Sequence, residues 1–207
     1  KKGHCVLLVI TFFANQCLSM IYNAINVSCP SAPIMSSPET AIIIGAGPSG
    51  LLTALALSKI LKRVTLIEKH ANFTPRGATF GLAPNGIKAL NEIDPSIYHD
   101  LQKVGLRTPG GGLMLPWWEM RDVLLRKVTE MKKVTGGVVE LITGRVFESL
   151  KDDGTSVTVE LEGRAATKDR EVIKGDFLVG CDGVHSSVRE WLSLPPALAG
   201  GGRMFRG

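Results

Sequence analysis

The stretch from Ala41 to Glu68 constrains the fold of this chain more than any other part of it. It reads AIIIGAGPSGLLTALALSKILKRVTLIE. A short apolar run, Ala41–Ile44, precedes a glycine-rich turn, and an Ala/Leu-rich segment then leads to a second apolar run, Val64–Ile67. Two apolar runs that flank a helix-forming segment predict strand, turn, helix and strand, which is the βαβ unit of a parallel sheet.

The spacing of the glycines adds a functional prediction to this unit. Gly45 permits a tight turn off the first strand, Gly47 lets the backbone approach a pyrophosphate, and Gly50 allows the helix to pack close to the sheet. Pro48 suits the first helical turn, where its missing N–H has no intrahelical partner to lose. The helix N-terminus offers free N–H groups and partial positive charge to phosphates.

Glu68 ends the second strand, where an acid in such a unit accepts hydrogen bonds from a ribose diol. The unit therefore predicts a bound adenine dinucleotide, although FAD and NAD(P) share this pattern and a purely structural βαβ turn is the alternative. The candidate cofactor-binding residues of this unit are Gly45, Gly47, Pro48, Ser49, Gly50, Glu68 and Lys69.

Composition excludes several other classes of protein. The chain has 207 residues, 44% hydrophobic and 21% charged, which is typical of one globular domain or of a domain plus part of another. The net charge of +5 is modest and its Lys and Arg are scattered, so a nucleic-acid partner is not expected. The four cysteines show no metal-ligand spacing, and neither a metal site nor a disulfide framework is predicted.

Residues 1–35 differ from the rest. Two lysines precede an uncharged stretch, Cys5–Val27, whose most apolar part is Val6–Ala14. A basic start and a short apolar core are typical of a signal peptide or targeting leader. Polar residues within this stretch weigh against a membrane-spanning helix. If residues 5–27 are retained, however, they could associate with a membrane. Met35 is a natural first residue for the protein, so the third interpretation is that the residues before it are a non-native extension. The protein would then be cytoplasmic.

The segment between the βαβ unit and residue 134 predicts loops and helices. The expected elements are short helices at Asn85–Ile93 and Pro95–Val104, a loop at Gly105–Pro116, and a long helix from about Glu119 to Val134. Two arginines are candidate ligand contacts, because Arg76 lies in the loop after Glu68 and Arg121 lies in the first turn of the long helix, where a cation invites an anionic partner. A solvated arginine is the alternative for each. Trp117 and Trp118 are expected to pack in the core or at the start of the helix, and a substrate platform is the alternative.

Short alternating and apolar runs dominate the region after the long helix. They predict a β-meander over about residues 138–175, followed by a buried strand at Phe177–Gly180. Asp182 and Gly183 come one residue after this last strand, in the segment CDGVHSSVR. A polar residue at the end of a parallel strand is a plausible ligand contact, and an ordinary turn is the alternative.

The motifs GAGPSG, Glu68 and FLVGCDGVHSSVR together resemble the FAD-dependent aromatic hydroxylases, which are single-component flavoprotein monooxygenases of the para-hydroxybenzoate hydroxylase type. The resemblance covers roughly Ala41 to Arg189 and favours FAD over NAD(P) as the bound cofactor. It implies that the glycine turn holds the FAD pyrophosphate and Glu68 its ribose. It further implies FAD contacts for Arg76 and Arg121, and a cofactor-binding role for Asp182 and Gly183.

The resemblance also implies the chemistry. NAD(P)H would reduce FAD, a flavin C4a-hydroperoxide would form with O2, and one oxygen atom would pass to a small organic substrate. No catalytic acid, base or nucleophile from the protein is required, and none is assigned. Same-fold alternatives are an FAD-dependent reductase or dehydrogenase, and a different class of alternative is a truncated, non-catalytic nucleotide-binding protein.

The expected fold is α/β, with a Rossmann-like FAD-binding βαβ unit, a parallel sheet and a β-meander insertion. The expected division is a leader or extension at 1–35, an FAD-binding domain at 36–190 and the start of a truncated remainder at 191–207. The family's later Gly-Asp motif and most of its substrate domain are not expected within this sequence. The chain therefore resembles the N-terminal portion of such an enzyme.

Overall fold

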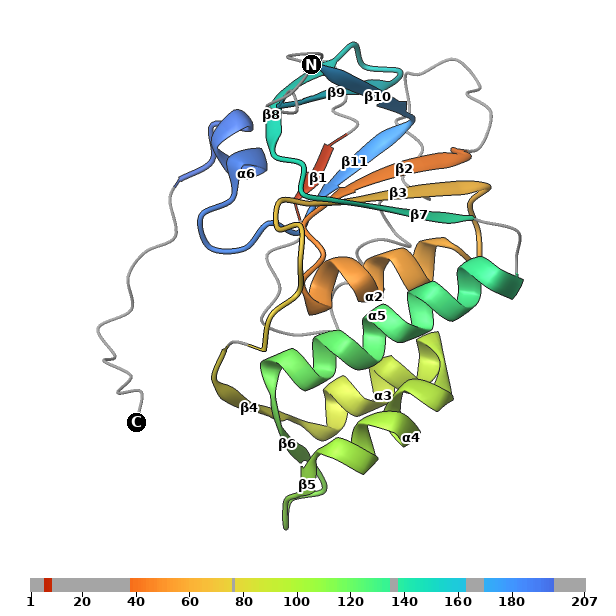
Figure 1. Ribbon diagram of the computed structural model, residues 1–207, viewed down its shortest axis with the longest axis vertical. Helices are drawn as coiled ribbons and strands as arrows, with labels where there is room; N and C mark the ends of the chain where they lie inside the picture. Colours follow the sequence, from red (N-terminus) through yellow and green to blue (C-terminus); the bar gives the residue numbers. More distant parts are fainter. Residues whose placement is uncertain (1–5, 9–37, 76, 135–137, 163–169, 196–207) are drawn as a thin grey trace.

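The central feature of the fold is a parallel sheet of five strands (Figure 1). The computed structural model describes residues 6–8, 38–75, 77–134, 138–162 and 170–195. In spatial order the strands are β1 (Val6–Leu8), β11 (Phe177–Gly180), β2 (Thr40–Ile44), β3 (Arg63–Glu68) and β7 (Val139–Thr143). Each neighbouring pair is parallel, so all five strands end at the same edge.

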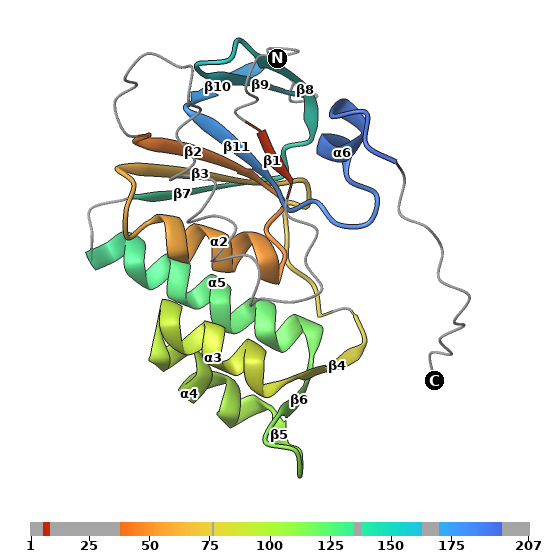
Figure 2. The same cartoon turned by 180° about the vertical axis from the view of Figure 1, so that it is seen from behind.

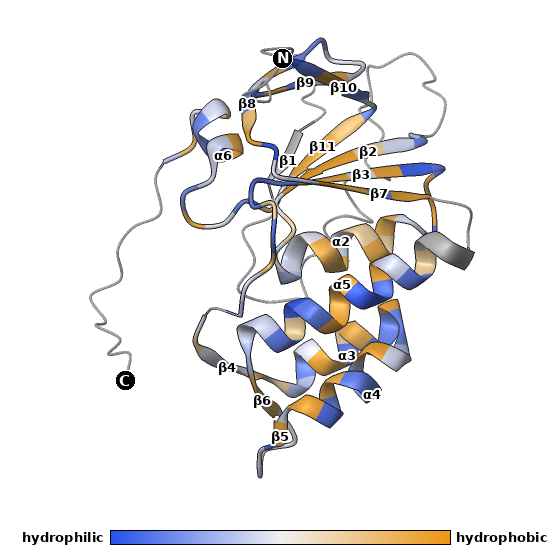
Figure 3. Ribbon diagram, viewed as in Figure 1, coloured by the Kyte–Doolittle hydropathy of each residue, from blue (hydrophilic) through white to orange (hydrophobic). Residues whose placement is uncertain are grey.

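The apolar runs form central strands because both faces of the sheet are covered. Ile43 belongs to the larger hydrophobic core on the helical face, whereas Ile42 and Ile44 belong to a second core on the opposite face. The strands β11, β2, β3 and β7 are accordingly coloured largely as hydrophobic in Figure 3. The predicted βαβ unit and parallel sheet are confirmed.

Four helices lie on one side of the sheet, and Figure 2 shows the same arrangement from behind. They are α2 (Pro48–Leu57), α3 (Pro84–Ile93), α4 (Pro95–Val104) and α5 (Trp117–Val134). The first three begin with proline, which is favoured at that position. The predicted long helix begins two positions earlier than expected, because Trp117 and Trp118 are already helical.

A small antiparallel sheet at the far end of the helical layer was not expected. It consists of β4 (Thr79–Leu82), β6 (Leu113–Pro116) and β5 (Leu106–Arg107). The prediction of a loop over Gly105–Pro116 is therefore wrong at both ends of that segment. Leu113 and Leu115 are fully buried while Met114 between them is partly exposed, and this alternation of burial stabilises a strand.

The opposite face of the parallel sheet is covered by the meander β8 (Phe147–Asp152), β9 (Val157–Leu161) and β10 (Glu171–Gly175). The predicted meander over 138–175 began too early, because β7 pairs in parallel with β3 and belongs to the central sheet. Val157, Val159 and Leu161 point into the second core. Helix α6 (Ser187–Trp191) follows β11 and contributes Val188 to the same core.

Three residues of the N-terminal segment 1–35 are described, and they form the edge strand β1 beside β11. The remainder of that segment, and residues 196–207 at the other end, lie outside the described residues. Within the described part of the chain no helix is both long and apolar enough to cross a membrane. The division of the chain into a leader, a domain and a remainder stays a prediction.

Candidate functional site

The glycine turn lies between β2 and α2 and is held by close backbone contacts. Gly45 has a φ of +99°, a conformation that L side chains rarely adopt. A Cβ atom at Gly50 would lie 1.8 Å from the carbonyl oxygen of Gly45, and one at Gly45 would lie 2.5 Å from the carbonyl oxygen of Cys181. Both positions therefore require glycine, as the sequence predicted for the tight turn and for the close helix packing.

Glu68 lies at the end of β3 and faces this turn. Its Oε2 accepts a hydrogen bond from the Ala46 N–H at 2.9 Å, so the acid is tied to the turn directly. Its Oε1 accepts a hydrogen bond from the His70 N–H at 3.0 Å and lies 2.7 Å from His70 Nδ1. The Glu68 side chain is only 11% exposed, whereas the His70 side chain is 67% exposed.

These contacts determine the charge state of Glu68. Burial raises the pKa of this carboxyl group, but the N–H groups of His70 and Ala46 and the imidazole of His70 favour the charged form and outweigh burial. The pKa of Glu68 therefore lies below its ordinary value of 4.5. At neutral pH a buried carboxylate stands beside the glycine turn as a hydrogen-bond acceptor.

Asp182 and Gly183 follow β11, whose last residue is the neighbour of Ile44 in the sheet. Asp182 Oδ1 accepts a hydrogen bond from Ser186 Oγ at 2.5 Å, and its Oδ2 accepts one from the Ser187 N–H at 2.7 Å. The acid thus organises the turn into α6. Gly183 has a φ of +86°, a conformation that favours glycine, although a Cβ there would meet nothing within 4 Å.

Arg121 is placed on the helical side of the turn and is only 6% exposed. Its Nη1 donates to the carbonyl oxygen of Thr74 at 3.1 Å, and its Nε and Nη2 both donate to Asp122 Oδ1. A buried guanidinium on the first turns of α5 is therefore fixed from two directions. Arg76 lies outside the described residues, and its prediction is not tested.

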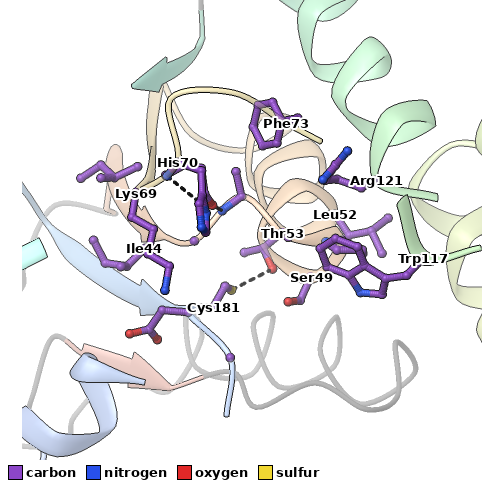
Figure 4. Close-up of a pocket in the computed structure, with 18 of the residues that line it drawn as sticks. Ile44, Ser49, Leu52, Thr53, Lys69, His70, Phe73, Trp117, Arg121 and Cys181 are labelled. Atoms are coloured by element: carbon purple, nitrogen blue, oxygen red, sulfur yellow. Dashed lines mark hydrogen bonds and ion pairs between the residues drawn. The ribbon is translucent and has the colours of Figure 1, made fainter. Parts of the chain in front are cut away.

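One pocket of about 760 Å³ brings these segments together, as the close-up in Figure 4 shows. Its walls include most of the predicted site residues: Gly45, Gly47, Pro48, Ser49, Glu68, Lys69, Arg121, Asp182 and Gly183. Gly50 is not on the wall and acts instead as the contact between α2 and the turn. Residues far apart in the sequence therefore meet at the carboxyl end of the parallel sheet, where open α/β sheets bind ligands.

The pocket also contains residues that sequence reasoning did not select. Phe73, Trp117, His70 and Cys181 all line it. Trp117 was expected to pack in the core or at the start of the helix; it is the first residue of α5 and is 37% exposed. A hint was available for His70, because it follows Glu68 by two residues, but nothing in the local pattern distinguishes Phe73 or Trp117 from packing residues.

The geometry of this pocket fits an adenine dinucleotide. The glycine turn presents backbone at a place that a Cβ would fill, the start of α2 directs N–H groups outward, and a buried carboxylate stands next to both. Among the described residues, no group of three or more His, Cys, Asp or Glu side chains could hold a metal ion.

Comparison with known protein families gives two matches that together span most of this region. Residues 43–103 match an NAD(P)-binding Rossmann-like domain, and residues 113–204 match an FAD-binding domain. The first match contains the glycine turn and Glu68. The second contains Arg121, Asp182 and Gly183.

Curated relatives include two fungal proteins described as FAD-dependent monooxygenases. The one from Penicillium canescens is 31% identical over 173 residues, which are 72% of this chain and 34% of the relative. The one from Gibberella moniliformis is 30% identical over 188 residues, which are 78% of this chain and 42% of the relative. The matched part of the chain therefore spans about a third to two fifths of the length of these relatives.

Solved structures share the fold. A flavin-dependent monooxygenase in complex with FAD and substrate superimposes with a TM-score of 0.64 at 22% identity, over 78% of this chain and 33% of that protein. The p-nitrophenol 4-monooxygenase of Pseudomonas putida gives a TM-score of 0.62 at 22% identity, over 73% of this chain and 43% of that protein. The family and sequence matches therefore support an FAD-dependent aromatic hydroxylase-like family for this chain, and the solved structures share its fold over the part that matches.

Proposed function

We propose that this chain forms the FAD-binding part of an NAD(P)H-using monooxygenase that transfers one oxygen atom from O2 to a small organic substrate. The observation that carries the proposal is the meeting of the glycine turn, Glu68 and the Asp182–Gly183 turn on one pocket. The names of the fungal relatives support the reaction class, and the shared fold supports the cofactor.

The roles of the residues follow from their positions. The backbone of Gly45–Gly50 and the N-terminus of α2 would hold the diphosphate of FAD, because N–H groups and the helix dipole favour anions there. Glu68 would accept hydrogen bonds from the ribose hydroxyls, since its carboxylate is charged and lines the pocket. Lys69, exposed at the pocket edge, adds positive charge near the same end.

The other cofactor contacts come from distant segments. Arg121 would place its guanidinium near the diphosphate, and Asp182 and Gly183 would border the cofactor at the end of β11. Arg76 is proposed as a further FAD contact from its sequence position alone. When bound, FAD supplies the redox chemistry with NAD(P)H and O2, while the residues of this chain bind it, orient it and exclude water from its phosphates.

Reconstitution tests the cofactor half of the proposal. The purified chain is mixed with FAD, passed through a desalting column, and examined for retained flavin absorbance. We expect retained flavin in the chain and little in a variant whose glycine turn is disrupted. A chain that is folded by circular dichroism but retains no flavin would contradict the proposal.

Oxygen insertion is tested with labelled O2 on the full protein to which this chain belongs. We expect NAD(P)H-dependent consumption of O2 and one labelled oxygen atom in the product. A reductase or dehydrogenase of the same fold would give an unlabelled product, and a non-catalytic nucleotide-binding protein would bind FAD without oxidising NAD(P)H.

A further inference from the structure

Trp117 borders the pocket, although the sequence favoured packing in the core or at the start of the helix. It is the first residue of α5 and lines the pocket, and the edge of its ring lies 3.6 Å from the place where a Cβ of Gly47 would be. Its Cβ atom lies 3.2 Å from the corresponding point of Gly77. The indole therefore covers the glycine turn from the helical side while 37% of the residue stays exposed.

The guanidinium of Arg121 lies against two aromatic rings. Its Cζ atom is 5.1 Å from the centroid of Phe73 and 5.7 Å from that of Trp117, both within the range of a cation–π contact. Figure 4 shows the three side chains together at one end of the pocket. All three residues line the pocket, so the cation and both rings border the volume that a ligand would fill.

The three side chains reach this point from two separate segments. Trp117 and Arg121 are four residues apart on α5, which places them on the same face of the helix. Phe73 comes from the loop after β3, and the neighbouring Thr74 accepts the hydrogen bond from Arg121 Nη1. A long, flexible arginine side chain is thereby restricted to one orientation beside the glycine turn.

We propose that Phe73 and Trp117 are positioning residues that hold the Arg121 guanidinium against the diphosphate of FAD. This inference rests on the proposed function, since it assumes that FAD occupies the pocket. The two uncharged rings attract the Arg121 guanidinium, and its positive charge remains for an anionic ligand. Asp122 is 44% exposed in its side chain and takes up Nε and one hydrogen of Nη2, so further N–H groups of Arg121 remain for an anion.

A double-mutant cycle distinguishes positioning from simple packing. The variants are Trp117→Leu, Arg121→Met and the two combined, with FAD affinity measured by fluorescence titration. We expect Trp117→Leu to raise the Kd for FAD about tenfold in the unaltered background, and less than about twofold when Arg121 is already Met. Trp117→Phe keeps a ring and should restore most of the affinity, while Phe73→Leu should behave as Trp117→Leu does.

Matched controls separate this effect from a general loss of stability. Trp118→Phe and Trp191→Phe alter tryptophans that do not line the pocket and should leave the Kd unchanged. The same weakening by Trp117→Leu in both backgrounds would overturn the inference, because the residue would then act independently of Arg121.

A readout without FAD keeps the two proposals distinguishable. The Nε–H resonance of Arg121, observed by NMR in the cofactor-free chain, should be shifted by the ring currents of Phe73 and Trp117. Leucine at either position should move it, and Trp118→Phe should not. A resonance indifferent to both substitutions would overturn the positioning role even if FAD binds. A resonance that responds in a chain that binds no FAD would instead overturn the proposed function, and with it the diphosphate as the target of Arg121.

Discussion

The Glu68 carboxylate accepts a hydrogen bond from the Ala46 N–H at 2.9 Å, so the acid that ends β3 is fastened to the glycine turn that ends β2. A single side chain thus connects the carboxyl ends of the two strands of the βαβ unit. The same carboxylate lines the pocket. Its substitution should therefore affect both the local backbone and the bound cofactor.

Replacing Glu68 by Gln should weaken FAD binding. The amide keeps the size of the side chain but loses the charged acceptor, and a hydrogen bond to a charged group contributes about 1.5–3 kcal/mol. We expect the Kd for FAD to rise about 10- to 100-fold, measured by calorimetric titration. Glu130→Gln, on the exposed surface of α5, is the matched control and should bind FAD as the unaltered chain does. Equal affinities for all three proteins would remove Glu68 from the site.

At acid pH, the free energy of unfolding should depend on the charge of the Glu68 carboxylate. Because the pKa of Glu68 is lower in the folded state than its ordinary value of 4.5, the charged form stabilises the fold. That contribution is complete above about pH 4.5 and is lost as the pH falls through the lower, folded-state value. Urea unfolding of the cofactor-free chain at a series of acid pH values should show a smaller loss for Glu68→Gln than for the unaltered chain. Parallel curves would contradict this prediction.

Gly50→Ala should disrupt the turn, whereas Gly110→Ala should be tolerated. The added methyl group at Gly50 would lie 1.8 Å from a backbone oxygen, and the backbone cannot yield as a flexible side chain can. A Cβ at Gly110 would meet nothing within 4 Å. We expect the first variant to lose about 3 kcal/mol of unfolding free energy and its FAD affinity, and the second to lose neither. Thermal and chemical denaturation with FAD titration would measure both.

Asp176→Asn should destabilise the sheet without touching the pocket. Asp176 Oδ2 accepts hydrogen bonds from the N–H groups of Glu39 and Thr40 at 2.8 Å each, and these join the start of β2 to the start of β11. Burial raises the pKa of Asp176, but these bonds outweigh it and lower the pKa overall. We expect a loss of about 2 kcal/mol in unfolding free energy with FAD affinity retained. The exposed Glu92→Gln is the control, and a coincident unfolding curve for Asp176→Asn would contradict the assigned role.

The parts of the fold that were predicted from sequence depend on local signals. The βαβ unit was predictable because periodicity, glycine spacing and the terminal acid all lie within Ala41–Glu68. The partner of β7 was not, since an apolar strand looks the same whether it joins a meander or a parallel sheet. The strands β5 and β6 were missed because Gly110–Gly112 suggested a loop, although the alternation of burial at Leu113 and Leu115 supports a strand.

The site shows the same division between local and distant information. The glycines of the turn and Glu68 could be predicted from their spacing, and Asp182 and Gly183 could be predicted from the resemblance to a family. Phe73 and Trp117 could not be predicted as site residues, because an aromatic residue in a loop or at a helix start has the same local pattern whether it packs in a core or borders a ligand. Only the tertiary arrangement brings them to Arg121.

The contact between Gly45 and Cys181 affects the order in which parts of this fold can form during synthesis. The glycine turn leaves the ribosome early, but β11, which lies beside β2 and packs the Cys181 carbonyl against the turn, is translated long afterwards. A nascent chain that ends before Phe177 therefore carries an exposed, unsupported loop. The edge of β2 that pairs with β11 is open at that stage, so the environment of the glycine turn is completed only after residues 177–181 have been synthesised.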